Sequence, residues 1–318
     1  MRPLSSRTGR RVHPALLSFA LAWMAWGPAP RPSPAQDGRA TIRAEVALVN
    51  LVFTATDRKG RVVEGLGPED FELFEDGKAQ RIEYFSDPGK GSDVPLTIAL
   101  LVDTSGSVRQ RLEYEKEAAA RFFREILRPE RDLALVIQFD SEVNLVQDFT
   151  QDPEALYRAL DSLRAGNNTA LYDAVYLAAE EKLRDEAGRK VVVVITDGAD
   201  TSSIVQKETA IEAAQKNDIL IYGIGVQGGR FRTDFGVLRK FARETGGEFF
   251  SPRASVEEIR DAFLSIQRDI RGHYSLGYTP SNRLRDGAFR KIEIRSKRPG
   301  VRVRTRSGYY APRSSRDY

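Results

Sequence analysis

The chain has 318 residues, of which 41% are hydrophobic and 30% are charged, and it contains no cysteine. These proportions are typical of a soluble globular protein, and the length suffices for one large domain and a smaller one. The lack of cysteine excludes disulfides, thiolate metal sites, thiol redox chemistry and a lipid-modified cysteine.

The first 35 residues have the pattern of a secretory signal peptide. Arginines precede the apolar block ALLSFALAWMAW at 15–26, and Ser33-Pro34-Ala35 offers a cleavage site of the small-x-small kind. The block is shorter than the roughly 20 residues that a membrane-spanning helix needs. We therefore expect cleavage near Ala35 and an exported protein, periplasmic or secreted, without a transmembrane anchor. A basic disordered tail is the alternative.

Charge is unevenly distributed along the chain. The leader holds five arginines and no acidic residue, so the basic pI of the full chain does not predict nucleic-acid binding. From Arg271 to Tyr318, by contrast, 13 Lys and Arg residues stand against three acidic ones. We expect this segment to dock on an acidic part of the chain or on an acidic partner.

Residues 40–86 are expected to form an all-β unit, followed by a linker at 87–95. AEVALVNLVFTATD is apolar and rich in strand-forming residues. FELFEDGKAQRIEYF is a hairpin signature, in which Asp76-Gly77 supplies the positive φ angles of a tight turn. The acidic side chains around this turn, Glu75 among them, are interpreted as turn and solvent-exposed residues rather than calcium ligands.

Strands and helices alternate from residue 96 to residue 270. Nearly continuous apolar runs predict strands at 96–102, 133–139, 191–195 and 219–226. Helical periodicity predicts helices at 114–127, 169–183, 206–216, 235–245 and 255–270. EVNLVQDFT, directly after the second strand, predicts an antiparallel edge hairpin. The fold class is therefore α/β, with a doubly wound, mostly parallel sheet covered by helices on both faces.

Residues 273–312 are expected to form a basic β segment. In VRVRTR the alternation of Val and Arg places Arg302, Arg304 and Arg306 on one strand face, interpreted as a solvated face rather than a phosphate-binding stripe. No aromatic residues interleave there, so nucleic acid is not an expected partner. Because their charges are complementary, we expect this segment and the N-terminal β unit to form a small β-sandwich.

Oxygen-bearing side chains follow two of the predicted strands. The first strand ends on Asp103, Ser105 and Ser107; the third ends before Asp197, and Thr169 lies at the start of a predicted helix between them. Carboxyl ends of parallel strands share one edge of a sheet, where ligands bind in open α/β folds. Hydroxyl and carboxylate oxygens suit Mg²⁺, Mn²⁺ or Ca²⁺. The sequence therefore predicts a divalent-metal site at this edge.

This pattern, Asp103-x-Ser105-x-Ser107 followed by Thr169 and by Asp197 in a Thr-Asp-Gly turn, resembles the metal-ion-dependent adhesion site of von Willebrand factor A domains. The resemblance covers about residues 95–270, so the domain is expected at 96–270. The flanking VVEGLGPEDFELFEDGKAQRIEYF and SGYYAP also resemble bacterial secreted proteins of the acidobacterial type that are related to this family.

The resemblance implies a Rossmann-like domain that binds a protein partner and is not an enzyme. Ser105 and Ser107 would ligate the metal directly, and Thr169 directly or through water. Asp103 and Asp197 would act mostly through waters. An open coordination position would accept an Asp or Glu carboxylate from the partner. The expected function is thus an exported, metal-dependent adhesion module.

Two alternative functions remain open. The site residues could serve only as helix caps and turns, which would leave a structural envelope protein with a vestigial metal site. A metal-dependent hydrolase would need a general base. However, His273 is predicted away from the strand edge, there is no GxSxG elbow, and Asp200 is the one spare carboxylate.

The stretch GIGVQG at 223–228 formally matches the GxGxxG pattern of dinucleotide-binding folds. Two of its glycines fall inside a predicted strand rather than in the first turn between a strand and a helix. The position therefore argues against a dinucleotide site.

Overall fold

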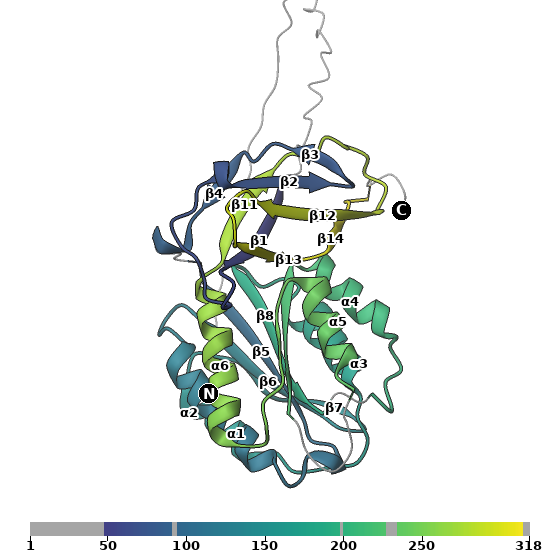
Figure 1. Ribbon diagram of the computed structural model, residues 1–318. Helices are drawn as coiled ribbons and strands as arrows, with labels where there is room; N and C mark the ends of the chain where they lie inside the picture. Colours follow the sequence, from purple (N-terminus) through teal and green to yellow (C-terminus); the bar gives the residue numbers. More distant parts are fainter. Residues whose placement is uncertain (1–47, 91–93, 198–199, 227–233, 314–318) are drawn as a thin grey trace, which may run out of the picture. The chain divides into compact units, whose positions relative to one another are not determined.

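The computed structural model describes residues 48–90, 94–197, 200–226 and 234–313 (Figure 1). The predicted signal peptide lies outside these residues. The described chain contains one six-stranded sheet and two four-stranded sheets.

The six-stranded sheet has the order β10-β9-β8-β5-β6-β7. Its strands are β5 (Leu96–Asp103), β6 (Leu133–Phe139), β7 (Val143–Thr150), β8 (Arg189–Thr196), β9 (Ile219–Gly225) and β10 (Phe249–Phe250). Neighbouring strands are parallel except for β6 and β7, which form the expected antiparallel edge. Every residue of β5 is buried, as a central parallel strand requires when helices cover both faces. The predicted α/β fold class is confirmed.

Helices cover the two faces of this sheet in groups of three (Figure 1). The first group is α1 (Leu112–Ile126), α2 (Pro153–Ser162) and α6 (Val256–Arg271). The second is α3 (Leu171–Tyr176), which continues as a π-helix at Leu177–Lys182, with α4 (Lys207–Lys216) and α5 (Gly236–Thr245). β5 shows the division clearly: Ile98 and Leu100 pack toward the first group, and Leu101 packs toward the second.

Helix α2 was not among the predicted helices, although the sequence carries a start signal for it. Asp152 is the N-cap residue, and its side chain accepts a hydrogen bond from the amide of Glu154, while Pro153 occupies the first helical position. Within the described residues, no helix is both long and apolar enough to cross a membrane.

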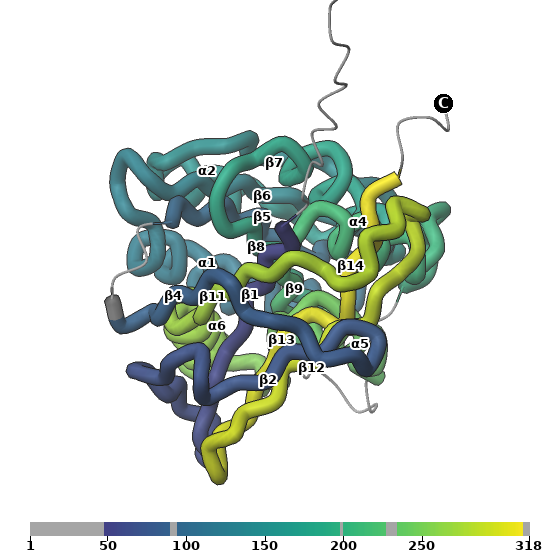
Figure 2. The backbone as a smooth tube through the Cα atoms, turned by 90° about the horizontal axis from the view of Figure 1, so that it is seen from above, coloured from purple at the N-terminus to yellow at the C-terminus, as the bar shows by residue number. Residues whose placement is uncertain are grey.

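The two four-stranded sheets combine N-terminal and C-terminal strands (Figure 2). The N-terminal strands are β1 (Val49–Thr56), β2 (Phe71–Glu75), β3 (Lys78–Gln80) and β4 (Tyr84–Ser86). The C-terminal strands are β11 (Tyr274–Tyr278), β12 (Phe289–Ser296), β13 (Arg302–Thr305) and β14 (Gly308–Tyr310). β1 pairs with β11 and β13, whereas β2 pairs with β12. These pairings confirm that the two segments form one β-sandwich.

Aromatic rings form the core of the sandwich. The ring of Phe53 packs edge-on against Phe71, with centroids 4.9 Å apart, and stacks on Tyr274 at 5.2 Å. The predicted hairpin turn is confirmed, because Asp76 and Gly77 have φ angles of 48° and 77° between β2 and β3.

Glu75 corrects the expectation that the acidic side chains near this turn are solvent-exposed. Only 2% of its surface is exposed, and its Oε2 atom accepts hydrogen bonds from the hydroxyls of Tyr278 at 2.6 Å and Tyr309 at 2.8 Å. Burial and the bond to this carboxylate raise the pKa of both tyrosines. The two phenols thus satisfy a buried acceptor that would otherwise destabilise the sandwich.

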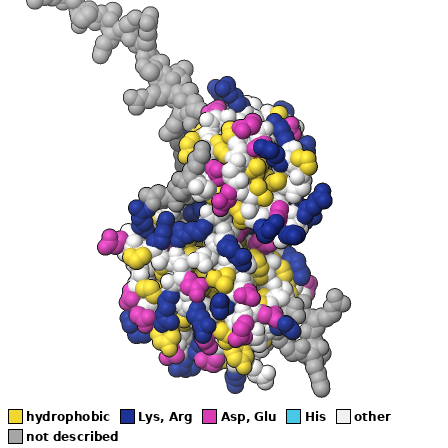
Figure 3. All heavy atoms as spheres, turned by 60° about the vertical axis from the view of Figure 1, so that its left-hand side comes forward, with side chains coloured by type: hydrophobic (Ala, Val, Ile, Leu, Met, Phe, Trp, Pro, Cys, Tyr) yellow, Lys and Arg dark blue, Asp and Glu magenta, His cyan; other side chains and the backbone are white. Residues whose placement is uncertain are grey.

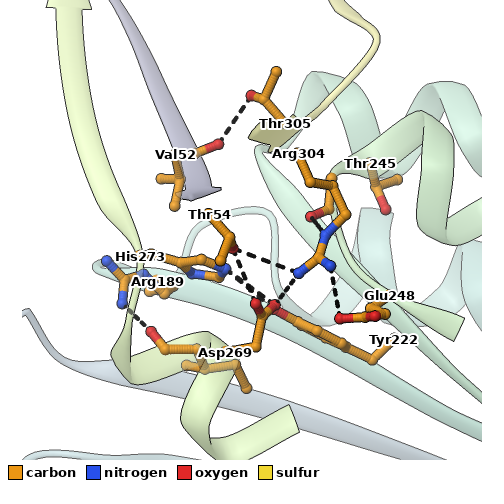
Figure 4. A network of polar contacts seen from close by, with 12 residues as sticks. Val52, Thr54, Arg189, Tyr222, Thr245, Glu248, Asp269, His273, Arg304 and Thr305 are labelled. Atoms are coloured by element: carbon orange, nitrogen blue, oxygen red, sulfur yellow. Dashed lines mark hydrogen bonds and ion pairs between the residues drawn. The ribbon is translucent and has the colours of Figure 1, made fainter. Parts of the chain in front are cut away.

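A buried polar network joins the sandwich to the six-stranded sheet (Figure 4). Its centre is Asp269 of α6, whose carboxylate accepts hydrogen bonds from Thr54 Oγ1 at 3.0 Å, from Tyr222 Oη at 2.6 Å and from Arg304 Nη2. Burial alone would raise the pKa of Asp269, but His273, Arg304 and Tyr222 hold it well below its usual range. The carboxylate therefore remains charged and fixes α6 to β13.

The prediction of a solvated arginine face is wrong for two of the three arginines. Arg304 also binds Glu248 at 2.6 Å, and Arg306, only 9% exposed, pairs with Asp218 and donates to the carbonyl oxygen of Asn50 at 3.0 Å. Arg302 alone of the three is exposed. The alternation placed the arginines on one face correctly, but that face packs against the α/β part of the chain.

On the face drawn in Figure 3, Lys and Arg side chains lie among Asp and Glu side chains.

We predict that Arg304→Gln lowers the free energy of unfolding by about 2 kcal/mol or more, because Asp269 would stay buried without its cation. Arg302→Gln, on the same strand but exposed, should change it by less than about 0.5 kcal/mol. Denaturant unfolding of both variants provides the measurement. Equal losses for the two substitutions would contradict the role given to Arg304.

Another buried carboxylate holds the amino end of β5. Asp132 has no exposed side-chain surface, and it accepts hydrogen bonds from the amide of Leu96 at 2.9 Å, from Arg128 Nη2 at 2.9 Å and from Arg271 Nη2 at 3.0 Å. Although burial opposes ionisation, these donors lower the pKa of Asp132 to about 2. One side chain thus ties the start of β5 to the ends of α1 and α6.

This pKa predicts a pH-dependent contribution to stability. The folded-state pKa lies below the ordinary value of 3.8, so the stabilisation is present above about pH 4 and is lost as the pH falls through about 2. Asp132→Asn should therefore cost about 2 kcal/mol at pH 7, and roughly 1 kcal/mol less than that at pH 3. Guanidinium unfolding at both pH values checks this. Glu117→Gln, in an exposed pair with Arg121, is the matched control, and a pH-independent cost of Asp132→Asn would refute the assignment.

Candidate metal centre

Adjacent strands carry the two predicted aspartates to one edge of the sheet. β5 ends at Asp103, β8 ends at Thr196, and the parallel register sets Val102 beside Ile195. Asp197 follows directly, so both carboxylates lie at the carboxyl ends of neighbouring strands, as the sequence predicted.

Asp103 is completely buried and is held by neutral donors. Its Oδ1 accepts from the amide of Ser105 at 2.8 Å, and its Oδ2 accepts from Thr196 Oγ1 at 2.6 Å. Burial raises the pKa of Asp103; the two hydrogen bonds oppose the shift and nearby Asp197 adds to it. Within the described residues no ion pair involves this carboxylate, so its surroundings favour the binding of a cation.

The two predicted serine ligands lie side by side. Ser105 Oγ and Ser107 Oγ are 3.0 Å apart at a short 3₁₀ turn, Gly106–Val108. Ser105 is buried, whereas Ser107 is exposed. Helix α1 has Arg111 as its N-cap residue, and the side chain of Ser105 makes no capping hydrogen bond. The alternative that these serines only cap the following helix is therefore not supported.

Thr169, only 4% exposed, belongs to a loop that is bonded to both neighbouring loops. On one side, the amide of Gly106 donates to the carbonyl oxygen of Asn167 at 2.9 Å. On the other, the amide of Thr169 donates to Thr201 Oγ1 at 2.9 Å, and its carbonyl oxygen accepts from the amide of Thr201 at 2.8 Å. The three loops that carry the predicted ligands are thus fixed to one another by backbone contacts.

Arg111 is a residue of this region that the sequence interpretation missed. Its Nη2 lies 2.9 Å from Asp197 Oδ2, its Nη1 is 3.4 Å from the carbonyl oxygen of Ser107, and its Nε is 3.1 Å from Glu115 Oε1. Burial raises the pKa of Glu115 to about 8, against the opposing effect of Arg111. The spacing of Arg111 and Glu115 by four residues was the available signal, but the predicted start of the helix at 114 left Arg111 outside it.

The two candidate general bases of the hydrolase alternative are both occupied by structural contacts. Asp200 Oδ1 accepts from the amide of Leu171 at 2.9 Å and from Ser203 Oγ at 2.6 Å, so Asp200 holds the start of α3. His273 is 2% exposed and lies in the Asp269 network, away from the carboxyl edge as predicted. His273 is therefore not placed to activate a serine or a water at the predicted site, and Oδ1 of Asp200 already has a structural role.

Two of the three glycines of GIGVQG allow close packing of α5 on β9. Gly223 and Gly225 lie within β9, and a Cβ atom on Gly225 would stand 2.6 Å from the ring of Phe235. Close approach of α5 to the strand therefore explains Gly225 without a phosphate ligand. Gly228 lies outside the described residues.

In the part of the chain that the structure describes, no three His, Cys, Asp or Glu side chains form a cluster that could hold a metal. A metal in this region would consequently depend on the hydroxyl oxygens of Ser105, Ser107 and Thr169 in addition to the two aspartates.

Known proteins resemble somewhat more than half of this chain. An uncharacterized protein of Borreliella burgdorferi is 28% identical over 194 residues, 56% of this chain and 56% of that protein, so the match spans about half the length of that relative. Among solved structures, conserved hypothetical protein BatB of Bacteroides thetaiotaomicron has 20% identity and a TM-score of 0.47, covering 55% of this chain and 99% of BatB. The vWF domain of the type V pili tip protein Mfa5 of Porphyromonas gingivalis has 15% identity and a TM-score of 0.49, covering 56% and 95% of the two chains.

The sequence profile of the von Willebrand factor type A domain matches residues 97–263, more than half of the chain. These residues include all of β5 except Leu96, and thus Asp103, together with the first half of α6. The chain therefore belongs to the von Willebrand factor type A domain family.

Proposed function

We propose that this protein is an exported, divalent-metal-dependent protein-binding module. Its metal site would consist of Asp103, Ser105, Ser107, Thr169 and Asp197. The observation that carries the proposal is the environment of Asp103, a fully buried carboxylate that has only neutral donors and lies next to a pair of hydroxyls 3.0 Å apart. A buried charge without a counter-ion is destabilising, so a cation here would relieve that cost.

The residues present fit a hard cation such as Mg²⁺, with Mn²⁺ or Ca²⁺ as substitutes. Ser105 and Ser107 would be direct ligands and Thr169 direct or water-linked, while Asp103 and Asp197 would act mainly through waters. When bound, the ion would supply a Lewis-acidic position that a carboxylate can complete. An Asp or Glu of a protein partner is the ligand that this chemistry favours.

Membership in the family supports binding rather than catalysis. The contacts of Asp200 and His273 support it independently, because a hydrolase would require a free base. Export rests on the signal-peptide pattern of residues 1–35. The structural envelope alternative shares this fold and differs in needing no metal.

The first test is a titration of the chain from residue 36 onward with Mn²⁺, in which calorimetry measures the affinity. Asp103→Asn keeps the size of the side chain and removes its charge, so it should weaken Mn²⁺ binding by at least about tenfold. Asp140→Asn is the matched control, because Asp140 follows β6 at the same sheet edge and is not a proposed ligand. Affinity that survives both Asp103→Asn and Asp197→Asn would defeat the site assignment.

Partner capture from an envelope extract, with Mg²⁺ or with EDTA, separates the functions. Metal-dependent capture that Asp103→Asn abolishes is the expected result. Capture that is indifferent to EDTA would favour the structural alternative. Turnover of phosphoesters or peptides that the same substitution abolishes would favour the hydrolase.

A further inference from the structure

A buried guanidinium bridges two of the proposed metal-binding loops. Arg111 donates to the Asp197 carboxylate at 2.9 Å and to the backbone oxygen of Ser107 at 3.4 Å. The side chains of Arg111 and Asp197 are only 7% and 14% exposed. Solvent therefore screens this charge weakly, and it acts on anything that binds between the loops.

Glu115 orients the guanidinium from behind. Its Oε1 accepts from Arg111 Nε at 3.1 Å, and its buried Oε2 has no hydrogen-bond partner among the described residues. The Nε atom of Arg111 thus binds Glu115 of α1, and both terminal nitrogens point toward the loops of the site. A guanidinium held at three points is fixed in place, unlike a surface arginine.

The formal charges of the site determine how Arg111 affects its affinity for ions. Asp103 and Asp197 contribute two negative charges, and Arg111 cancels one of them. A divalent cation would leave the site with one net positive charge, whereas the same site without Arg111 would be neutral. At short range and low exposure, one unit of charge changes an ion's affinity by an order of magnitude or more.

We propose that Arg111 is a built-in counter-ion of the metal centre, which weakens binding of the cation by itself and strengthens binding of an anionic group to the loaded site. This inference rests on the proposed function and adds a regulatory property to it. The divalent ion and the carboxylate of a partner would bind cooperatively, each improving the affinity for the other. Arg111 is a positioning and charge-setting residue, not a ligand.

The test compares two variants that differ only at Arg111. Glu115→Gln is the reference, because it makes position 115 neutral in both proteins, and Arg111→Gln/Glu115→Gln is the second protein. Electron paramagnetic resonance gives the Mn²⁺ affinity. Relaxation of acetate methyl protons by the bound Mn²⁺ gives the affinity for a carboxylate at the metal. Loss of Arg111 should tighten Mn²⁺ binding by at least about tenfold and weaken acetate binding by at least about threefold.

The opposite signs of the two changes separate this role from a purely structural one. If Arg111 only held the loops in place, its loss would weaken both ligands together, and that result would overturn the inference, as would equal affinities in the two proteins. Absence of Mn²⁺ binding from both would overturn the proposed function itself and the inference with it. Arg111→Lys/Glu115→Gln keeps the charge and should behave like the reference.

Should the double glutamine variant fail to fold, an apolar pair serves the same purpose. Arg111→Met/Glu115→Leu replaces the buried pair by side chains of similar size, a change that folded proteins often tolerate. The same opposite shifts in Mn²⁺ and acetate affinity are expected, and parallel shifts would again refute the proposal.

Discussion

The antiparallel pairing of β1 with β11 and β13 is the constraint on which the rest of the structure depends. It returns the chain, after the whole α/β part, to the strand from which it departed. The sandwich core is therefore built from residues more than 200 positions apart, and neither segment could bury its aromatic side chains alone. Asp269 adds a second connection, because it bonds at once to β1, β9 and β13.

The direction of the parallel strands separates the sandwich from the proposed metal site. The contacts to the sandwich and to the last turn of α6 lie at the amino ends of the strands. There Asp132 accepts a hydrogen bond from the amide of Leu96, and Arg189 donates one to the carbonyl oxygen of Ile270. Asp103 and Asp197 lie at the opposite, carboxyl ends. The stabilising networks and the proposed binding face therefore lie at different edges of the sheet. A substitution such as Arg304→Gln can thus test the Asp269 network without changing a residue of the proposed metal site.

Features with a local signal could be predicted from the sequence, and features that depend on distant partners could not. The strand ends at Asp103 and Asp197, the hairpin turn at Asp76 and the antiparallel edge all follow from short-range pattern. The alternation of β2 places Glu75 on the buried face with Phe71 and Leu73, but the tyrosines that satisfy its carboxylate lie more than 200 residues away and could not be predicted. Arg111 belongs to an intermediate class, since its spacing from Glu115 was visible but its contact with Asp197 required the fold.

The buried carboxylates, compared with one another, give the strongest physical argument for a cation at Asp103. Asp132 and Asp269 are each paired with arginines, and the pKa of each is lowered. Asp103 is equally buried, yet only neutral donors contact it and its pKa is raised. Buried Asp70 likewise pairs with Arg298, so among the buried aspartates of the described residues Asp103 is the one without a guanidinium partner. Arg111, at the same edge of the sheet, binds Asp197, and this leaves Asp103 as the carboxylate whose charge a bound divalent ion would balance.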